Sequence, residues 1–86
     1  MTTLTNWALR ERHGYFVFSG NVYDHPRFPD GHLVTTSAIV SCDWDGRRFK
    51  TGSREYWLVG PPEQEWVDWC KKNGYNYVDR FKDMMN

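Results

Sequence analysis

The chain has 86 residues, the size of one domain, and 17% of them are aromatic. Large rings bury much area per residue, so they suit a small core or a surface on which copies of the chain associate. Its 11 basic and 11 acidic residues give a formal net charge of zero. That balance argues against generic nucleic-acid binding through bulk charge.

The N-terminal residues, the apolar runs and the two cysteines indicate the cellular compartment and whether a metal is bound. Residues 1–6 are polar and predict no signal peptide. No apolar run approaches the ~20 residues of a membrane span. Cys42 and Cys70 lack the short spacing of a structural metal site, and we interpret both as free thiols in a reducing cytoplasm. We therefore expect a cytoplasmic protein with no membrane segment, no metal and no cofactor.

Turn signals recur about every ten residues through the first 60 residues. The alternation of Trp7 and Leu9 indicates a strand near the N-terminus. Between the later turns, β-branched and aromatic residues predict strands at 15–18, 21–23, 32–42, 47–51 and 54–59. This spacing is typical of a small antiparallel barrel or sandwich, and we expect an SH3-like β-barrel over residues 1–60.

Three irregularities are predicted within these strands. A bulge is expected at Gly20, because an isolated glycine in a strand often marks one. A kink is expected near Ser37 in the longest strand. Asp45-Gly46 fits a tight hairpin turn.

Residues 61–86 change to a helical pattern, giving an α+β protein with a helical C-terminal extension. Trp66, Trp69 and Cys70 fall on one stripe of a first helix, which we expect to lie over the barrel as core. Asn73-Gly74 is a helix C-cap signal. Asn76 is then placed to cap a second short helix whose shared face is Val78, Phe81 and Met85.

The most unusual stretch is "HPRFPDGHLVTTS", residues 25–37. Its two prolines stiffen the chain around Arg27 and lower the entropy lost when that side chain is held. Arginine presents a planar fork suited to phosphate or carboxylate. An anion and ring site is therefore predicted from nine residues: Tyr23, His25, Arg27, Phe28, Asp30, His32, Thr35, Thr36 and Ser37.

Each of these residues also has a simpler explanation. Arg27 can pair with Asp24 or Asp30, and the hydroxyls can decorate a strand. In the anion-site hypothesis, Arg27 grips phosphate, Thr36 and Ser37 donate to it, and Phe28 or Tyr23 faces a base. For residues 25–37 as a whole we favour an anion-binding site, because a loop that only connects two strands does not need this rigid mixture of prolines, charges, rings and hydroxyls.

Catalysis is the weaker interpretation of the same stretch. His25 and His32 lie near Asp24 and Asp30, an arrangement compatible with acid–base chemistry. The aspartates are equally explained by turns, and no nucleophile motif or phosphate loop accompanies them. We therefore expect a binding protein and no enzyme.

A second basic stretch, residues 46–54, holds Arg47, Arg48, Lys50 and Arg54. It is able to attract phosphates. Acidic residues flank it, so a solvated hairpin edge protected by charge is the favoured interpretation.

The runs "LTNWAL", "SGNVYDHPRFPDGHLVTTSAIV" and "TGSREYWLVG" resemble a kind of small protein of bacteriophages and prophages. The shared pattern is G-x-V-Y-x-H-P-R-F-x-D-G-x-x-V-x-T-S-x-I, and the match covers about residues 4–60. It runs through Gly20, Val22, Tyr23, His25 to Phe28, Asp30, Gly31, Val34, Thr36, Ser37 and Ile39. The helices after Gly60 fall outside it.

The resemblance implies an inhibitor of host defence acting in the bacterial cytoplasm. One mechanism is a sponge that binds a nucleotide signal, with a homo-oligomer placing the pocket between protomers. Another is an anti-CRISPR-type inhibitor that binds a host defence protein through the aromatic helices. A third is a phage accessory protein that binds only itself. We favour the sponge.

Overall fold

The computed structural model describes residues 1–80. They form six strands and one helix of more than a single turn. In chain order these are β1 (Thr2–Arg12), β2 (Tyr15–Tyr23), β3 (His32–Thr35), β4 (Ile39–Asp43), β5 (Arg48–Thr51), β6 (Glu55–Leu58) and α1 (Gln64–Lys72). The expected α+β class is confirmed.

The six strands form one mixed sheet in the order β3-β2-β1-β6-β5-β4. All neighbours are antiparallel except β1 and β6, which run parallel and pair Thr2–Leu4 with Tyr56–Leu58. Turn spacing alone does not reveal this pairing, because it joins the first and last strands of the chain. The predicted closed, antiparallel SH3-like barrel is therefore corrected to an open, mixed sheet with β3 and β4 at its edges.

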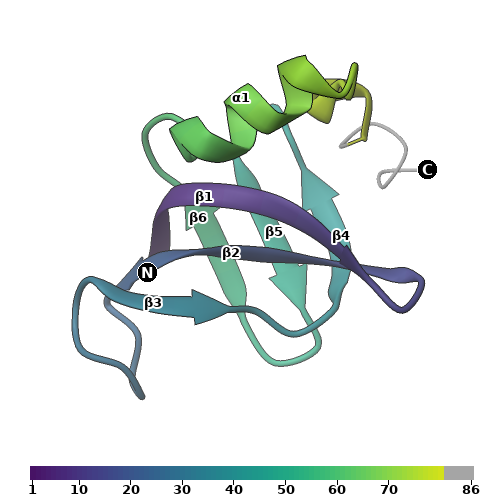
Figure 1. Cartoon of the computed structure of the whole chain (residues 1–86). Helices are drawn as coiled ribbons and strands as arrows, with labels where there is room; N and C mark the ends of the chain where they lie inside the picture. Colours follow the sequence, from purple (N-terminus) through teal and green to yellow (C-terminus); the bar gives the residue numbers. More distant parts are fainter. Residues whose placement is uncertain (81–86) are drawn as a thin grey trace.

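The sheet bends at the β1–β6 junction, so its two halves face each other. Figure 1 shows β1, β2 and β3 running across β4, β5 and β6, with α1 along one end of this arrangement. β2 and β4 approach one another although they are not neighbours in the sheet. The bend creates an enclosed space for side chains from both halves, as in orthogonal sheet packing.

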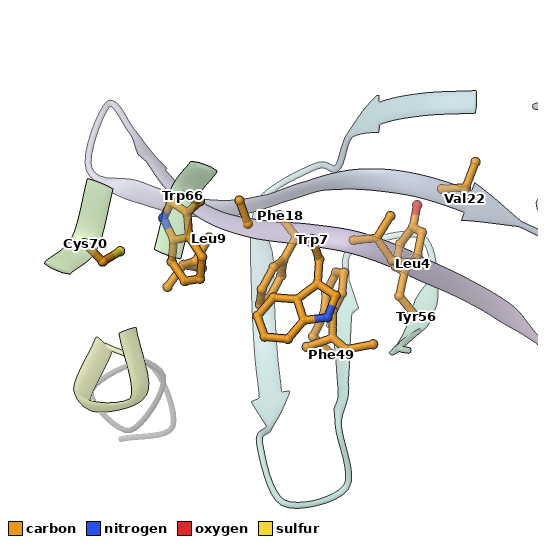
Figure 2. Packing of buried hydrophobic residues seen from close by; sticks show 11 residues of the cluster. Leu4, Trp7, Leu9, Phe18, Val22, Phe49, Tyr56, Trp66 and Cys70 are labelled. Carbon is orange, nitrogen blue, oxygen red and sulfur yellow. The ribbon is translucent and has the colours of Figure 1, made fainter. Parts of the chain in front are cut away.

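Aromatic side chains fill that space (Figure 2). The Trp7 ring meets Phe18 edge-on at 6.0 Å, and Phe18 lies 4.4 Å from Phe49. Phe49 in turn stacks on Tyr56 at 4.9 Å and 7°. Trp7, Phe18 and Phe49 are at most 1% exposed. These rings explain how a chain this short obtains a core, as its aromatic content predicted.

The strand irregularity lies opposite Gly20 rather than at it. The β1–β2 register shifts between Thr5 and Ala8, so β1 carries the bulge, and Asn6 has φ 50°. A Cβ on Gly20 would lie 2.6 Å from the carbonyl oxygen of Thr5. Glycine is required here because the bulged strand approaches its backbone closely.

The hairpin turn between β4 and β5 spans residues 44–47. The amide of Arg47 donates to the carbonyl of Trp44 at 3.1 Å, and Arg47 itself takes the left-handed conformation with φ 53°. Its guanidinium lies 5.7 Å from the ring centroids of both Trp7 and Trp44 and donates to the carbonyl of Gly60 at 2.6 Å. The turn was predicted, whereas this role of Arg47 as a bridge between turn and core was not.

The predicted strand 32–42 breaks rather than kinks. β3 ends at Thr35 and β4 begins at Ile39, with Ser37 in the break. This break sends the chain from one half of the sheet to the other. It also places residues 35–37 at the rim of the space between the halves.

Helix α1 covers the core as expected, with one correction. Trp66 and Cys70 are buried, but Trp69 is 54% exposed and its ring lies beside Tyr75 at 5.9 Å. Asn73 and Gly74 end the helix, the latter at φ 68°. Within residues 1–80, no helix is long and apolar enough to cross a membrane.

The second helix begins where the sequence predicts. The side chain of Asn76 accepts hydrogen bonds from the amides of Val78 and Asp79 at 3.0 and 3.3 Å. Residues 77–80 are helical. The expected face residues Phe81 and Met85 lie outside the described residues.

Candidate functional site

A cavity of about 540 Å³ opens between the two halves of the sheet, beside the loop that joins β2 and β3. That loop, the break after β3 and the β5–β6 turn all contribute to its walls. The lining residues are His25, Arg27, Phe28, His32, Leu33, Val34, Thr35, Thr36, Ser37, Ser53, Arg54 and Tyr56.

The β2–β3 loop is held by its own polar groups. Asp30 accepts a hydrogen bond from the amide of Asp24 at 3.0 Å and so closes the loop across six residues. Gly31, at φ 86°, donates to the carbonyl of Val22 at 2.7 Å. Asp30 therefore shapes the loop, and it does not line the cavity.

His25 fixes the position of Arg27 within this loop. The Nδ1 of His25 accepts a hydrogen bond from the backbone amide of Arg27 at 3.0 Å. In the neutral ring this leaves the proton on Nε2, which is then a donor. The pKa of His25 is lowered, first by burial and then by the nearby charges of Arg54 and Arg27.

Phe28 lies against both histidines. It stacks on His32 with ring centroids 4.9 Å apart and an angle of 5°, and it lies 4.9 Å from His25 at 51°. One face of Phe28 is thus covered by His32. The other face of Phe28 is not covered by His32.

Two arginines from separate parts of the chain line the cavity. Arg27 comes from the β2–β3 loop, and Arg54 precedes β6. Arg54 donates to the hydroxyl of Thr2 at 3.3 Å. Within residues 1–80, no ion pair reaches either guanidinium, so the predicted alternative of Arg27 pairing with Asp24 or Asp30 is not observed.

No aspartate or glutamate is among the described residues that line the cavity. Its ionisable lining consists of His25, Arg27, His32, Arg54 and Tyr56. Burial raises the pKa of the Tyr56 hydroxyl, and Arg54 partly offsets this shift. The lining is therefore positively charged and rich in donors, which favours an anion.

The hydroxyl groups divide into two roles. Thr36 is buried, and its hydroxyl accepts from the amide of Phe18 at 3.1 Å while donating to the carbonyl of Ser37 at 3.0 Å. Its proton is committed to the fold, so Thr36 is a positioning residue rather than the expected donor to phosphate. Thr35, Ser37 and Ser53 are exposed at the cavity.

The structure brings most of the predicted residues together. Seven of the nine predicted residues line one cavity, whereas Tyr23 and Asp30 do not line it. The Tyr23 hydroxyl lies near Gly31 instead. Five lining residues were not predicted from the sequence: Leu33 and Val34 on β3, and Ser53, Arg54 and Tyr56. The last three reach the cavity because the sheet bends. The one available signal was that Arg54 sits in the basic stretch 46–54.

The other three basic residues of that stretch either pair with acidic residues or, in the case of Arg47, pack against aromatic rings. Arg48 lies 3.4 Å from Asp43, and Lys50 lies 3.9 Å from Glu55. The expected neutralisation by flanking acidic residues is therefore observed for these two residues, whereas the expected sheet edge is not, because β5 lies between β4 and β6. In the described part of the chain, no group of three or more His, Cys, Asp or Glu residues is placed to hold a metal.

Comparisons of the chain with protein-family models, with curated proteins and with solved structures find no match.

Proposed function

We propose that this protein binds and sequesters a small phosphate-containing ligand of nucleotide type, without chemical turnover. The observation that carries the proposal is the pair Arg27 and Arg54 in a cavity without a described acidic lining residue. Two guanidinium groups in one cavity, neither of them paired with a carboxylate of residues 1–80, give a phosphate two cationic partners. The outer face of the Phe28–His32 stack supplies a surface for the ring of a nucleotide.

The biological role that we propose is inhibition of a bacterial defence system by a phage-type sponge. The pattern of residues 20–39 supports this role through its resemblance to small phage and prophage proteins. Withholding a nucleotide signal needs affinity and no catalytic group. We further propose that the protein acts in the host cytoplasm as a homo-oligomer.

Thermal unfolding against a panel of nucleotides tests this function. The panel contains cyclic di- and trinucleotides, cyclic ADP-ribose isomers, ADP-ribose and ATP. A ligand present at a hundredfold over its Kd adds about 2.7 kcal/mol, which raises the Tm of a domain this small by several degrees or more. A selective shift that Arg27→Ala abolishes supports the function. A flat panel contradicts it.

A second candidate function rests on the C-terminal helix. Trp69 is 54% exposed and borders a groove of about 620 Å³ with Tyr75 and Arg80. An anti-CRISPR-type inhibitor would use such an aromatic rim to bind a defence protein. Trp69→Ala separates the two functions, because it removes protein binding and leaves a nucleotide-induced shift in Tm unchanged.

A further inference from the structure

Resting on the proposed function, we infer that the cavity selects a phosphate that carries two negative charges, as in a phosphomonoester or a diphosphate. A cyclic or dialkyl phosphodiester group, with one charge, is the disfavoured ligand.

The positive charge of the site is permanent and comes from two separate elements. Arg27 lies in the β2–β3 loop and Arg54 at the start of β6, and arginine stays protonated at any pH at which the protein folds. Both lie near enough to His25 to act on its charge. Both arginines thus contribute positive charge to the lining of one cavity, from different elements of the fold.

His25 adds a donor without adding charge. Its Nδ1 is occupied by the amide of Arg27 at 3.0 Å, so the neutral ring donates through Nε2. The charged groups that act on His25 are Arg54 and Arg27, and both oppose its protonation. The permanent positive charges in the described lining are thus those of the two arginines.

A phosphomonoester matches this charge. Its second pKa is about 6, so at neutral and higher pH it carries close to two negative charges on three oxygens that accept strong hydrogen bonds. A phosphodiester carries one charge and leaves one guanidinium uncompensated. In a partly enclosed cavity, where solvent screens less, that difference becomes selectivity.

Methyl phosphate and dimethyl phosphate test the inference, because they differ in charge and by one methyl group. We would titrate each into the protein at pH 8 and follow the side-chain resonances of the arginines and histidines by NMR. Methyl phosphate should bind at least tenfold more tightly. Arg54→Gln should reduce this ratio to below about threefold, and Arg27→Gln gives the same test from the exposed loop. Arg48→Gln, outside the cavity, should keep the wild-type ratio.

The outcomes separate the inference from the function on which it rests. Equal binding of the two phosphates, lost in Arg27→Gln, would overturn the charge selectivity and leave a phosphate site. Absence of binding by both would overturn the site and the inference together. A ratio that survives Arg54→Gln would also overturn it, because the second charge would then come from elsewhere.

Discussion

The Nδ1 of His25 accepts a hydrogen bond from the backbone amide of Arg27 at 3.0 Å. His25 therefore holds the backbone of Arg27, the residue that we propose binds the anion. Pro26, between these two residues, and Pro29, two residues after Arg27, restrict the backbone conformation of the loop. Acceptance at Nδ1 requires that nitrogen to be unprotonated. The loop conformation and the protonation state of His25 are therefore linked.

This link predicts a pH dependence of stability. The folded-state pKa of His25 is lowered from 6.5, so in acid the unfolded chain takes up a proton that the folded chain resists. The free energy of unfolding should fall as the pH drops through about 6.5 and level off below the lowered folded pKa. Thermal unfolding measured from pH 8 to pH 5 follows this loss.

His25→Asn isolates the contribution of that histidine. An asparagine side chain can accept the amide two residues on and does not titrate in this range. The variant should lose part of the decline in Tm between pH 7 and pH 5. His13→Asn, in the exposed β1–β2 turn, is the matched control and should keep the wild-type decline. An unchanged profile in His25→Asn would exclude the proposed link.

Gly20→Ala tests the close approach of the β1 bulge. Its Cβ would meet the carbonyl oxygen of Thr5 at 2.6 Å and the Cγ of Leu4 at 2.9 Å. Overpacking of this kind costs about 1–3 kcal/mol of unfolding free energy, measurable by urea denaturation. Gly52→Ala, where nothing lies within 4 Å, should change it by less than about 0.5 kcal/mol. Equal effects would mean that the bulge does not constrain Gly20.

Thr36→Val tests whether the hydroxyl serves the fold. The valine leaves the buried amide of Phe18 without its side-chain acceptor, at a cost of about 1–3 kcal/mol in the free energy of unfolding. Thr36→Ser keeps the hydroxyl and should cost less. Ligand affinity should be the same in wild type and Thr36→Ser. A Thr36→Val protein as stable as wild type would show that the hydroxyl is dispensable.

Arg47→Lys tests the bridge between the β4–β5 turn and the core. Lysine keeps the charge but cannot donate in the fork geometry that reaches the carbonyls of Leu58 and Gly60. The variant should lose about 1–2 kcal/mol of unfolding free energy. Arg48→Lys, whose partner Asp43 is exposed, should lose less than about 0.5 kcal/mol. Equal stability of both variants would refute the bridging role.

Local patterns in the sequence predicted local structure well. The strands, the turn at 44–47, helix α1 and the Asn76 cap follow from residue types and spacing that act over a few residues. The segment 25–37 was predicted to contain a site because its prolines, Arg27 and hydroxyl residues are close in sequence. Burial of Trp66 and Cys70 likewise follows from helical periodicity.

Long-range features were not predictable in the same way. The parallel β1–β6 pair joins segments more than fifty residues apart, and no local pattern encodes it. The bend that follows from this topology brings Arg54 and Tyr56 to the loop of Arg27. The hydrogen bond from the amide of Phe18 on β2 to the hydroxyl of Thr36 was likewise not predicted, because the two residues are 18 positions apart. The charge of Arg54 was visible in the sequence, but its position in the same cavity as Arg27 depends on the fold.

We expect Arg27 and Arg54 to bind one anion together from two elements of the fold. Isothermal titration with inorganic pyrophosphate at pH 8 measures this in wild type, Arg27→Gln, Arg54→Gln and Arg48→Gln. Each cavity variant should weaken the Kd at least tenfold, and Arg48→Gln should stay within about twofold of wild type. Wild-type affinity in either Arg27→Gln or Arg54→Gln would show that the two arginines do not share one anion.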